Sequence, residues 1–578
     1  MLVQGQGITI RPAGSELLSG ISFAIPGGAK IGLVGANGCG KTSLCRVIAG
    51  LQEADGGVLS VQRKVKIGWV PQHLTTTDDC TVLDYLAPDV LARRSELSRL
   101  EAAMGNPGNS PQELERILQQ YGELRESYDE EHGDLCETQA QRILSEIGLE
   151  LPLDAKVMQL SGGERNSLAL TRALLGNPDV LILDEPGNHL DFAGLERLEG
   201  ILRGYPGAVL LVSHNRRLLD RCVDRIWHMS HGSLQEYSGN YTDYRMTMLQ
   251  NAAAQLAQHA VQQAKLQRLE ELVKRFEQIA RATADPAWGK RLRARRTQLE
   301  KNREQAVDAP QIGSKTIDVQ IAARGSRADI AIELNNYRKS FGDRVLLSDV
   351  RFQIQAGERV GLIGPNGSGK TSLIRDLMER GSWEDPVIRI GPSFRVGYIS
   401  QHREQFRQSA ALLEALQLAT GAQDKEASAI LTRMQFQRRD FETAVRDLSG
   451  GEYNRLQLAA LLLQGANLLI LDEPTNHMDI PSKEIIEEAL VESEVTLLVV
   501  SHDRYLLDAV VDRLLIIENQ TITDFPGRFS QYRSSLDGPD SRAENEHDAQ
   551  RKKTEARAAQ HIARGDHKSA RKAAAKLR

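Results

Sequence analysis

The feature that most restricts the fold of this chain is a long pattern that occurs twice. The segment IGLVGANGCGKTSL at 31–44 returns, 329 positions later, as VGLIGPNGSGKTSL at 360–373. A second landmark, an acid that ends an aliphatic run, recurs at Asp184 and Asp472, which are only 288 positions apart. The first copy therefore carries 41 additional residues between the two landmarks. A chain of 578 residues is too long for one hydrophobic core, so we expect two copies of one α/β domain.

The segments around the two copies divide the chain further. The first copy spans residues 1–242, and its extra residues, at about 80–133, have near-helical apolar spacing on either side of the turn cluster GNPGNSP. This pattern predicts a helical hairpin inserted in the first domain. Residues 243–324 are predicted to form two long helices with a break near TADPAWG, a helical hairpin that links the copies. The second copy spans 325–535, and a basic tail occupies 536–578.

Composition excludes several classes of protein. The five cysteines are odd in number and contain no CxxC pair, so neither a disulfide framework nor a zinc site is indicated, which fits a reducing cytoplasm. The first residues show no signal-peptide pattern, and apolar runs such as VTLLVV are too short to span a bilayer. A net charge of −5 argues against nucleic acid binding over the whole surface but permits a local basic patch. We expect a soluble, cytoplasmic protein.

A glycine-rich loop follows an aliphatic run in each copy. Glycines allow backbone N–H groups to wrap phosphates at a helix N-terminus, the lysine reaches the β- and γ-phosphates, and the threonine hydroxyl ligates Mg²⁺. A glycine-rich turn of another kind is the alternative for one copy alone, but two copies with matching partners downstream exclude it. The predicted ATP-binding residues are Gly35, Asn37, Gly38, Gly40, Lys41, Thr42 and Ser43 in the first loop and Gly364, Asn366, Gly367, Gly369, Lys370, Thr371 and Ser372 in the second.

Paired acids end two aliphatic runs, VLILDEP at 180–186 and LLILDEP at 468–474. The aspartates suit the Mg²⁺ shell, and the glutamates can polarise an attacking water as general bases. Acids that only cap a helix are the alternative, which the repetition makes implausible. The predicted metal ligands here are Thr42 and Asp184 in the first copy and Thr371 and Asp472 in the second, and the predicted general bases are Glu185 and Glu473.

Each copy also has a histidine at the end of a later aliphatic run, His214 in SHN and His502 in SHD. A lone histidine after a strand is more often structural, but the paired context favours contact with the γ-phosphate. We therefore count both histidines as catalytic.

The sequence LSGGE occurs at 160–164 and again at 448–452. With the phosphate loop, glutamine, DE pair and histidine in the same order twice, the chain resembles tandem ATP-binding cassette domains. In that family the ATP sites are composite, so the resemblance implies that the signature of one cassette closes on ATP held by the other. Ser449, Gly450 and Gly451 would then complete the site of Lys41, and Ser161, Gly162 and Gly163 would complete the site of Lys370. The same resemblance implies that the glutamines of the two copies, Gln72 and Gln401, bind the nucleotide and its Mg²⁺.

The two predicted sites are not equivalent. Alignment of FGDRVLLSDVRF with PAGSELLSGISF places Phe341, which can stack on adenine, opposite Pro12, which does so only weakly. The first copy also has Gly187 where the second has Thr475, and SHN where the second has SHD. Because both glutamates remain, we expect two active sites with different affinities for ATP.

Among cassette proteins, the chain resembles the F subfamily (ABC-F), which includes translational throttle-like factors that act on the ribosome. The resemblance rests on the EP(T/G)NH(L/M)D wording of both copies, the long helical linker and the helical insertion, and it covers about residues 1–535. It implies binding in the ribosomal E site, with the linker on 23S rRNA and P-site tRNA. The insertion resembles the arm of that family, which reaches toward the L1 stalk region or the tRNA elbow.

The stretch WGKRLRARRTQLEKNR at 288–303 carries seven lysines and arginines against one acid. In a helix these cations point in all directions, which leaves no apolar face for a membrane and no clean stripe for a core. A solvated charged helix is the alternative, but the excess of positive charge favours an external polyanion. The predicted RNA-binding residues are Lys290, Arg291, Arg293, Arg295, Arg296, Lys301 and Arg303. Trp288, beside the break, could stack on a base, but we favour a role in capping the hairpin.

The tail from Arg551 to Arg578 has ten lysines and arginines and two acids among many alanines. RNA contact and a purely solubilising role remain equally open for it.

We therefore expect an ATPase that uses Mg²⁺ with ATP, works as a monomer with an intramolecular pair of cassettes, and shifts a ribosome–tRNA equilibrium when ATP closes the pair. The alternative is the ATPase subunit of a transporter with separate membrane subunits. A DNA-maintenance ATPase is a third option, but it would need a longer coiled coil or zinc modules. The sequence leaves open whether the protein controls elongation, rescues stalled ribosomes or protects from an antibiotic.

Overall fold

The structure is a computed structural model. It describes residues 1–11, 17–72, 79–106, 110–130, 133–188, 190–282, 286–304, 329–342, 344–399, 406, 408–476 and 478–536. Gln401, Pro12 and the basic tail, for which the sequence supports predictions, lie outside the described residues, as do the side chains of Trp288 and Arg303.

A mostly parallel sheet forms the centre of the first repeat, with strand order β5-β6-β7-β3-β8-β9. Neighbouring strands are parallel except β9, which runs antiparallel to β8. Strands β6 and β7 are buried along their whole length, which explains their continuous aliphatic sequence. The strands are β3 (Lys30–Gly35), β5 (Ile67–Val70), β6 (Val180–Asp184), β7 (Ala208–Val212), β8 (Arg225–Ser230) and β9 (Ser233–Ser238).

The second repeat has the same topology, with strand order β14-β15-β16-β12-β17-β18 and β18 antiparallel to β17. The sequence duplication is therefore a duplication of the α/β fold, as predicted. The strands are β12 (Arg359–Ile363), β14 (Val396–Ile399), β15 (Leu468–Asp472), β16 (Thr496–Val500), β17 (Arg513–Glu518) and β18 (Thr521–Phe525).

A smaller antiparallel sheet accompanies each central sheet, with orders β2-β1-β4 and β11-β10-β13. Strands β1 (Val3–Ile10) and β11 (Arg344–Gln355) largely alternate buried with more exposed residues, as expected for a sheet with one face on the core. The other strands of these two sheets are β2 (Leu18–Ile25), β4 (Gly56–Val61), β10 (Ile330–Phe341) and β13 (Ile388–Ile390).

Helices surround each central sheet, and several begin at residues of the repeated motifs. In the first repeat they are α1 (Lys41–Ile48), α5 (Cys136–Ile147), α6 (Gly162–Leu175), α7 (Phe192–Gly204) and α8 (Arg216–Cys222), with short 3₁₀ turns at Gly133–Leu135 and Val157–Gln159. In the second repeat they are α11 (Lys370–Arg380), α12 (Leu412–Thr420), α13 (Asp424–Arg433), α14 (Gly450–Leu463), α15 (Ile480–Glu492), α16 (Arg504–Val510) and α17 (Phe529–Leu536), with 3₁₀ turns at Arg438–Glu442 and Val445–Asp447.

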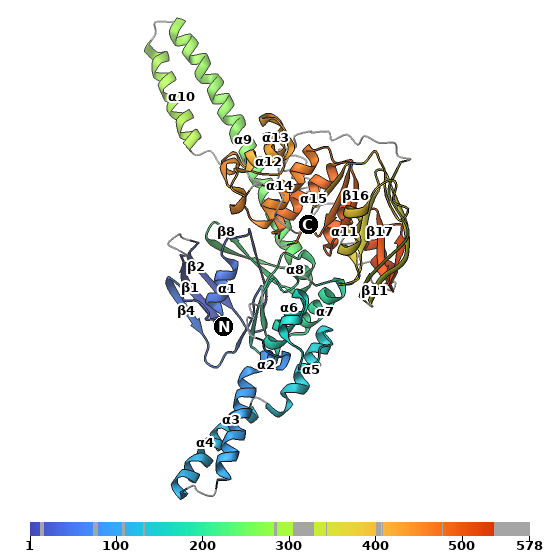
Figure 1. Cartoon of the computed structure of the whole chain (residues 1–578). Coiled ribbons are helices and arrows are strands. Elements are labelled where there is room, and N and C mark those ends of the chain that lie inside the picture. Colours follow the sequence, from blue (N-terminus) through green and yellow to red (C-terminus); the bar gives the residue numbers. More distant parts are fainter. Residues whose placement is uncertain are drawn as a thin grey trace.

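The insertion of the first repeat is an arm of two helices, α3 (Pro88–Met104) and α4 (Pro111–Glu130), that projects from the body at the bottom of Figure 1. The sequence predicted one helix on the N-terminal side of the turn cluster GNPGNSP. The structure instead ends a short helix, α2 (Val82–Leu86), and starts α3 at Pro88. Proline has no N–H to continue a helix but fits the first helical position, so it separates the two helices.

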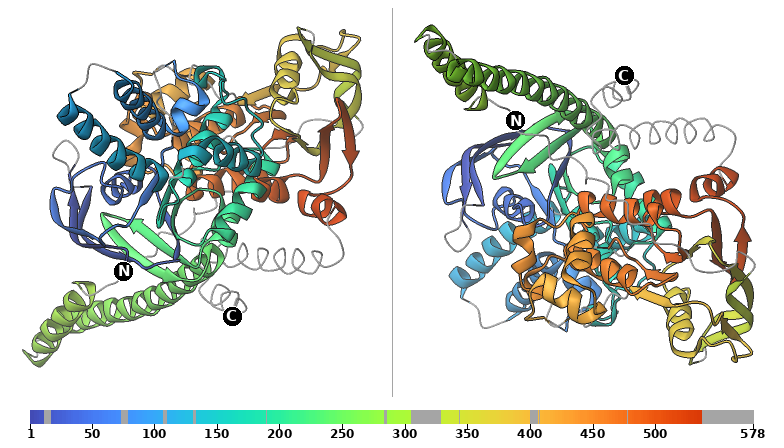
Figure 2. Two further views of the ribbon diagram at one scale, coloured as in Figure 1. Left: turned by 90° about the horizontal axis from the view of Figure 1, so that it is seen from below. Right: turned by 90° about the horizontal axis from the view of Figure 1, so that it is seen from above.

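The linker between the repeats is a hairpin of α9 (Tyr241–Ala282) and α10 (Pro286–Glu304) that leaves the body at the opposite end of the view from the arm (Figure 1), and Figure 2 shows it extending past both repeats. At 42 residues, α9 is about 60 Å long. The expectation that α10 has no stripe for a core was wrong in one respect. Leu299 is buried and Leu292 half-buried against apolar residues of α9, because a spacing of seven returns side chains to one helix face.

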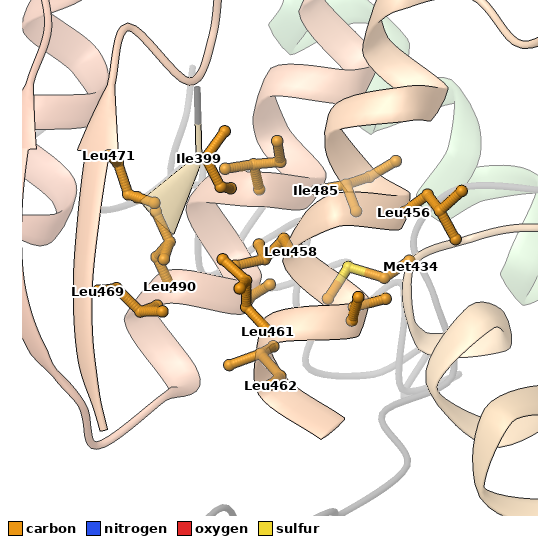
Figure 3. Close-up of a cluster of buried hydrophobic side chains, with 14 of the residues drawn as sticks. Ile399, Met434, Leu456, Leu458, Leu461, Leu462, Leu469, Leu471, Ile485 and Leu490 are labelled. Carbon is orange, nitrogen blue, oxygen red and sulfur yellow. The ribbon is translucent and has the colours of Figure 1, made fainter. Parts of the chain in front are cut away.

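The core around β15 of the second repeat is drawn in Figure 3. Leucines of α14 face Leu469 and Leu471 on β15, and Ile485 and Leu490 of α15 pack into the same cluster. Because these side chains are fully or almost fully buried, β15 and the starts of α14 and α15 are fixed relative to one another. The functional residues at the ends of these elements therefore sit on a rigid base.

Candidate active site

The two phosphate loops join the first core strand of each repeat to the following helix, β3 to α1 and β12 to α11. The residue before each helix is a glycine with φ of 103°, a left-handed conformation that favours glycine. The Nζ atom of Lys41 donates to the carbonyl oxygens of Gly35 at 2.8 Å and Ala36 at 2.9 Å. Lys370 makes the same two contacts in the second loop. Both ammonium groups are thus held over a helix N-terminus, where a phosphate can bind.

A threonine and an aspartate meet below each loop. Thr42 Oγ1 donates to Asp184 Oδ2 at 2.7 Å. In the second repeat a hydrogen bond from Thr371 partly offsets the burial that raises the pKa of Asp472. Hydroxyl and carboxylate oxygens side by side are the ligands Mg²⁺ prefers, so both sites fit the ion that accompanies ATP. Gln72, half-buried just after β5, belongs to the same edge of the sheet. Bound Mg²⁺ would neutralise phosphate charge.

Glu185 and Glu473 follow the last strand residue of β6 and β15 and have left-handed φ angles of 52° and 51°. Such a conformation in a residue other than glycine is strained and is held by surrounding structure, here by a backbone hydrogen bond from each glutamate to the next strand. Burial raises the pKa of Glu185 to about 7 and the pKa of Glu473 to about 8. A carboxylate with a pKa near neutrality is suited to take a proton from water.

The histidines lie in two loops, residues 213–215 after β7 and 501–503 after β16, which we call the switch loops. The backbone N–H of His214 donates to Glu185 Oε2 at 3.2 Å, and that of His502 donates to Glu473 Oε2 at 3.3 Å. Burial, with the charge of Lys41, lowers the pKa of His214, and burial with Lys370 lowers the pKa of His502 to about 4. Both imidazoles are therefore neutral at pH 7 and can donate or accept a hydrogen bond.

A cavity of about 550 Å³ lies between the repeats, and its walls come from both of them. Ser161, Gly162 and Gly163 of the first repeat line it, opposite Lys370, Glu473 and Phe341 of the second. Ser161 caps α6, so the backbone N–H groups that begin this helix face the cavity. The structure thus brings one predicted set of signature and phosphate-loop residues into one space. Phe341 is 61% exposed there, available to stack on a base.

A second pair of contacts between the repeats was missed by sequence reasoning. Asp479 Oδ2 accepts a hydrogen bond from the backbone N–H of Asn37 at 3.0 Å, and Asp191 Oδ2 accepts one from Asn366 at 3.1 Å. Each aspartate also caps the helix that follows it. The signal was available, because both copies place an aspartate seven residues after the aspartate that is predicted to bind the metal. These contacts join each phosphate loop to the other repeat.

At the first site, the hydrogen bond from Asn37 brings the phosphate loop of Lys41 together with Asp479 of the second repeat. In the second signature, Ser449 caps α14, and Gly450 is the first residue of that helix. Gly451 lies so close to Ser482 that an added Cβ would come within 3.0 Å of its hydroxyl. The second signature therefore packs against the same helix, α15, that carries Asp479 to the first phosphate loop.

The fold and these sites define a tandem-cassette ATPase, in which two phosphate-loop domains share residues across one interface. Family models described as ABC transporter match residues 18–188 and 347–476, and an extension model of the same description matches 227–319. The energy-dependent translational throttle protein EttA of Escherichia coli K12 is 33% identical over 529 residues, 90% of this chain and 93% of EttA. EttA of Mycobacterium tuberculosis H37Rv is 30% identical over 539 residues, 89% and 92% of the two chains. The chain belongs to the ABC-F family.

Solved structures show the same fold at lower identity. The structure titled RNase-L Inhibitor covers 92% of this chain and 93% of its own, with a TM-score of 0.59 and 18% identity. A structure titled as a model of ribosome-bound archaeal Pelota and ABCE1 has a TM-score of 0.53 and 21% identity, and it covers 92% and 80%. Within the described part of the chain, none of the helices is long and apolar enough to cross a bilayer.

Replacement of Phe341 with alanine is expected to weaken ATP binding at the second site by about 2- to 10-fold, because an aromatic stack contributes about 0.5–1.5 kcal/mol beyond area burial. Titration with a fluorescent ATP analogue measures this, in a Lys41→Ala background that leaves the second site to bind. Phe341→Tyr is the control, since it keeps the ring. Equal affinities for Phe341→Ala and Phe341→Tyr would contradict a stacking role.

Proposed function

We propose that this protein is an ATP-dependent ribosome-binding factor that modulates translation. ATP bound at both cassettes closes them, the closed form binds the ribosome, and hydrolysis releases it. Family membership supports this, because the relatives that match over about nine-tenths of the chain bear the name energy-dependent translational throttle protein.

The proposed chemistry assigns a role to each motif. Lys41 and Lys370 hold the β- and γ-phosphates, and the signature residues of the opposite cassette complete each phosphate cage. Thr42 with Asp184, and Thr371 with Asp472, hold Mg²⁺. Gln72 and Gln401 extend the metal and nucleotide shell. Glu185 and Glu473 take the proton of the attacking water, and the neutral switch histidines contact the γ-phosphate.

The observation that carries the ribosome proposal is the charge of α10. Lys290, Arg291, Arg293, Arg295, Arg296 and Lys301 are all exposed. Among the described contacts, Arg296 pairs with Glu277 of α9 at 2.6 Å. The other cations stand on a hairpin that projects from the cassettes (Figure 1). A cluster of exposed cations on a projecting element attracts a polyanion, and its electrostatic reach is about 10 Å at 0.1 M salt.

The resemblance to ABC-F proteins supports ribosomal RNA and tRNA as the polyanion. We propose that the hairpin contacts 23S rRNA and P-site tRNA from the ribosomal E site, and that the arm lies toward the L1 stalk region. The arm differs from α10 in charge, because α4 carries acids such as Glu113, Glu123 and Glu126. It therefore suits a basic protein surface more than an RNA backbone.

The base of the hairpin is tied to the interface that ATP would close. Arg245, in the first turns of α9, pairs with Glu484 of α15 at 2.6 Å. The same helix begins at Asp479, which contacts the phosphate loop of the first site. Arg216 pairs with Glu487 one turn further along α15, at 3.1 Å. A change in how the cassettes meet therefore changes the support of α9, which favours one ribosome-bound state over another.

Cosedimentation tests the proposal. The purified chain is mixed with 70S ribosomes and centrifuged through sucrose, with a non-hydrolysable ATP analogue, with ADP or without nucleotide. We expect the pellet to contain the protein mainly with the analogue. Binding that is absent in all three conditions, with intact ATPase activity, would reject the ribosome as partner. Recovery with membrane vesicles instead would favour the alternative, an ATPase subunit of a transporter.

A further inference from the structure

A single lysine of the second cassette touches the switch loops of both sites. Lys483 lies on α15, four residues after Asp479. Its Nζ atom donates to the backbone carbonyl of His214 in the first cassette at 3.1 Å. The same Nζ donates to Asp503 Oδ2 in the second cassette, also at 3.1 Å. One ammonium group thus bridges the loop of the first site and the loop of the second.

Each of the two switch loops that Lys483 contacts is hydrogen-bonded to a glutamate. In the first site, the backbone N–H of His214 donates to the Glu185 carboxylate, so the residue that Lys483 holds also holds the proposed general base. In the second site, Asp503 follows His502, whose N–H donates to Glu473. Asp503 is itself fixed, because its Oδ1 accepts from the backbone N–H of Tyr505 at 3.0 Å and caps α16. A movement of either switch loop therefore pulls on Lys483.

The bridge has no counterpart in the first cassette. With the offset of 288 that relates these segments, Lys483 corresponds to Leu195 and Asp503 to Asn215. The aspartates that precede them remain equivalent, since Asp191 and Asp479 cap their helices and contact the opposite phosphate loops in the same way. The duplication therefore preserves the contacts to the phosphate loops, but among the described residues only the second cassette supplies a charged link between the switch loops.

The bridge is also shielded from water. The side chains of Lys483 and Asp503 are 11% and 15% exposed, and both residues line the cavity that holds Lys370 and Glu473. An ion pair in such surroundings is screened less by salt than a surface pair, and removal of one partner leaves the other charge buried. Breaking this pair is therefore costly, so Lys483 and Asp503 are expected to move together.

We propose that Lys483 is a positioning residue that joins the two switch loops and couples hydrolysis at one site to hydrolysis at the other. As long as the switch loop of one site has not moved after hydrolysis, Lys483 restrains the switch loop of the other site. The proposal depends on the catalytic roles proposed for Glu185 and Glu473, which their double replacement tests separately.

The test measures how much ATP turnover is lost when one site is inactivated, once in the native chain and once in the Lys483→Met chain. If the sites are coupled, Glu473→Gln alone lowers total ATP turnover by more than about tenfold, although Glu185 is intact. When Lys483→Met is added to both proteins, the same Glu473→Gln change is expected to cost only about twofold, because the first site then cycles alone. Lys483→Met by itself should leave the KM for ATP within about twofold, as Lys483 contacts the loops and not the phosphate-binding lysines. All variants are measured as the full chain without ribosomes.

Two further variants separate positioning from folding. Lys483→Met with Asp503→Asn removes both charges, so no lone carboxylate is left buried, and it should uncouple the sites as Lys483→Met does. Lys483→Arg keeps a cationic donor and should keep the coupling. The matched control is Arg245→Met, which removes an ion pair between cassettes to the adjacent residue Glu484 and should leave the sites coupled.

Three results would overturn the proposal. Glu473→Gln could lower total ATP turnover by only about twofold in the otherwise native chain, which would show independent sites. It could still lower turnover by more than about tenfold when Lys483→Met is present, alone or with Asp503→Asn, which would place the coupling elsewhere. Arg245→Met could uncouple the sites equally, which would show a general effect of weakening the interface.

Discussion

Replacement of both Glu185 and Glu473 with glutamine is expected to lower ATP turnover by about 10²- to 10⁴-fold while ATP still binds, because loss of a general base costs that much in rate. Glutamine has nearly the shape of glutamate and keeps the amide oxygen that can accept the backbone N–H of His214 or His502. It cannot accept the proton of water. Each carboxylate is deeply buried with one oxygen that accepts no hydrogen bond from the described residues, so the change removes a base without breaking a structural contact.

The same double variant should remain on ribosomes, because the closed form that ATP favours can no longer be released by hydrolysis. Nucleotide binding by fluorescence, phosphate release and ribosome cosedimentation measure the three steps. Expression of this variant is expected to arrest translation in cells. Lys41→Ala with Lys370→Ala is the matched control, since it prevents ATP binding and should give neither ribosome retention nor arrest. Normal translation with the fully expressed glutamine variant would contradict the release mechanism.

Replacement of Arg291, Arg293 and Arg295 with glutamine is expected to lower ribosome affinity by about 10²-fold near 0.1 M salt and to reduce the salt slope of log K by about three. These side chains are exposed on α10, and this helix belongs to the hairpin that projects from the body (Figure 1). The ATPase rate without ribosomes should not change. Binding to ribosomes at several salt concentrations, with the ATP analogue present, gives both quantities.

The control for this prediction keeps the same change in net charge. Arg438, Arg439 and Arg446 are exposed on the second cassette, and their replacement with glutamine should leave both the affinity and the salt slope close to those of the native chain. Equal losses from the two triple variants would indicate a diffuse electrostatic attraction and not a contact made by α10.

Much of the fold could be predicted because its determinants are local or repeated. The phosphate loops need particular residues in consecutive positions, and the aliphatic runs before Asp184 and Asp472 can only be buried strands. The composition of the insertion and linker similarly indicated helices. Boundaries were less certain, since the separation of α2 from α3 depends on Pro88 and the seam of α10 depends on Leu299 meeting α9.

The direct hydrogen bonds between the cassettes were the part that sequence patterns did not reveal. Asp191 and Asp479 are ordinary helix caps in their own cassette, and their second oxygen finds a phosphate loop only when the other cassette is in place. Lys483 carries no motif at all. Its position between two switch loops follows from the packing of α15 against the first cassette.

By itself, therefore, the amino-acid sequence determined the doubled α/β architecture, the chemistry of each nucleotide site and the cationic helix, because each of these depends on residues close together in one repeat. Only the tertiary structure decided which hydrogen bonds join the two cassettes and that Lys483 contacts both switch loops. The physical reason is that a hydrogen bond across an interface depends on the placement of two rigid bodies within a few tenths of an ångström, and hundreds of residues separate its partners along the chain.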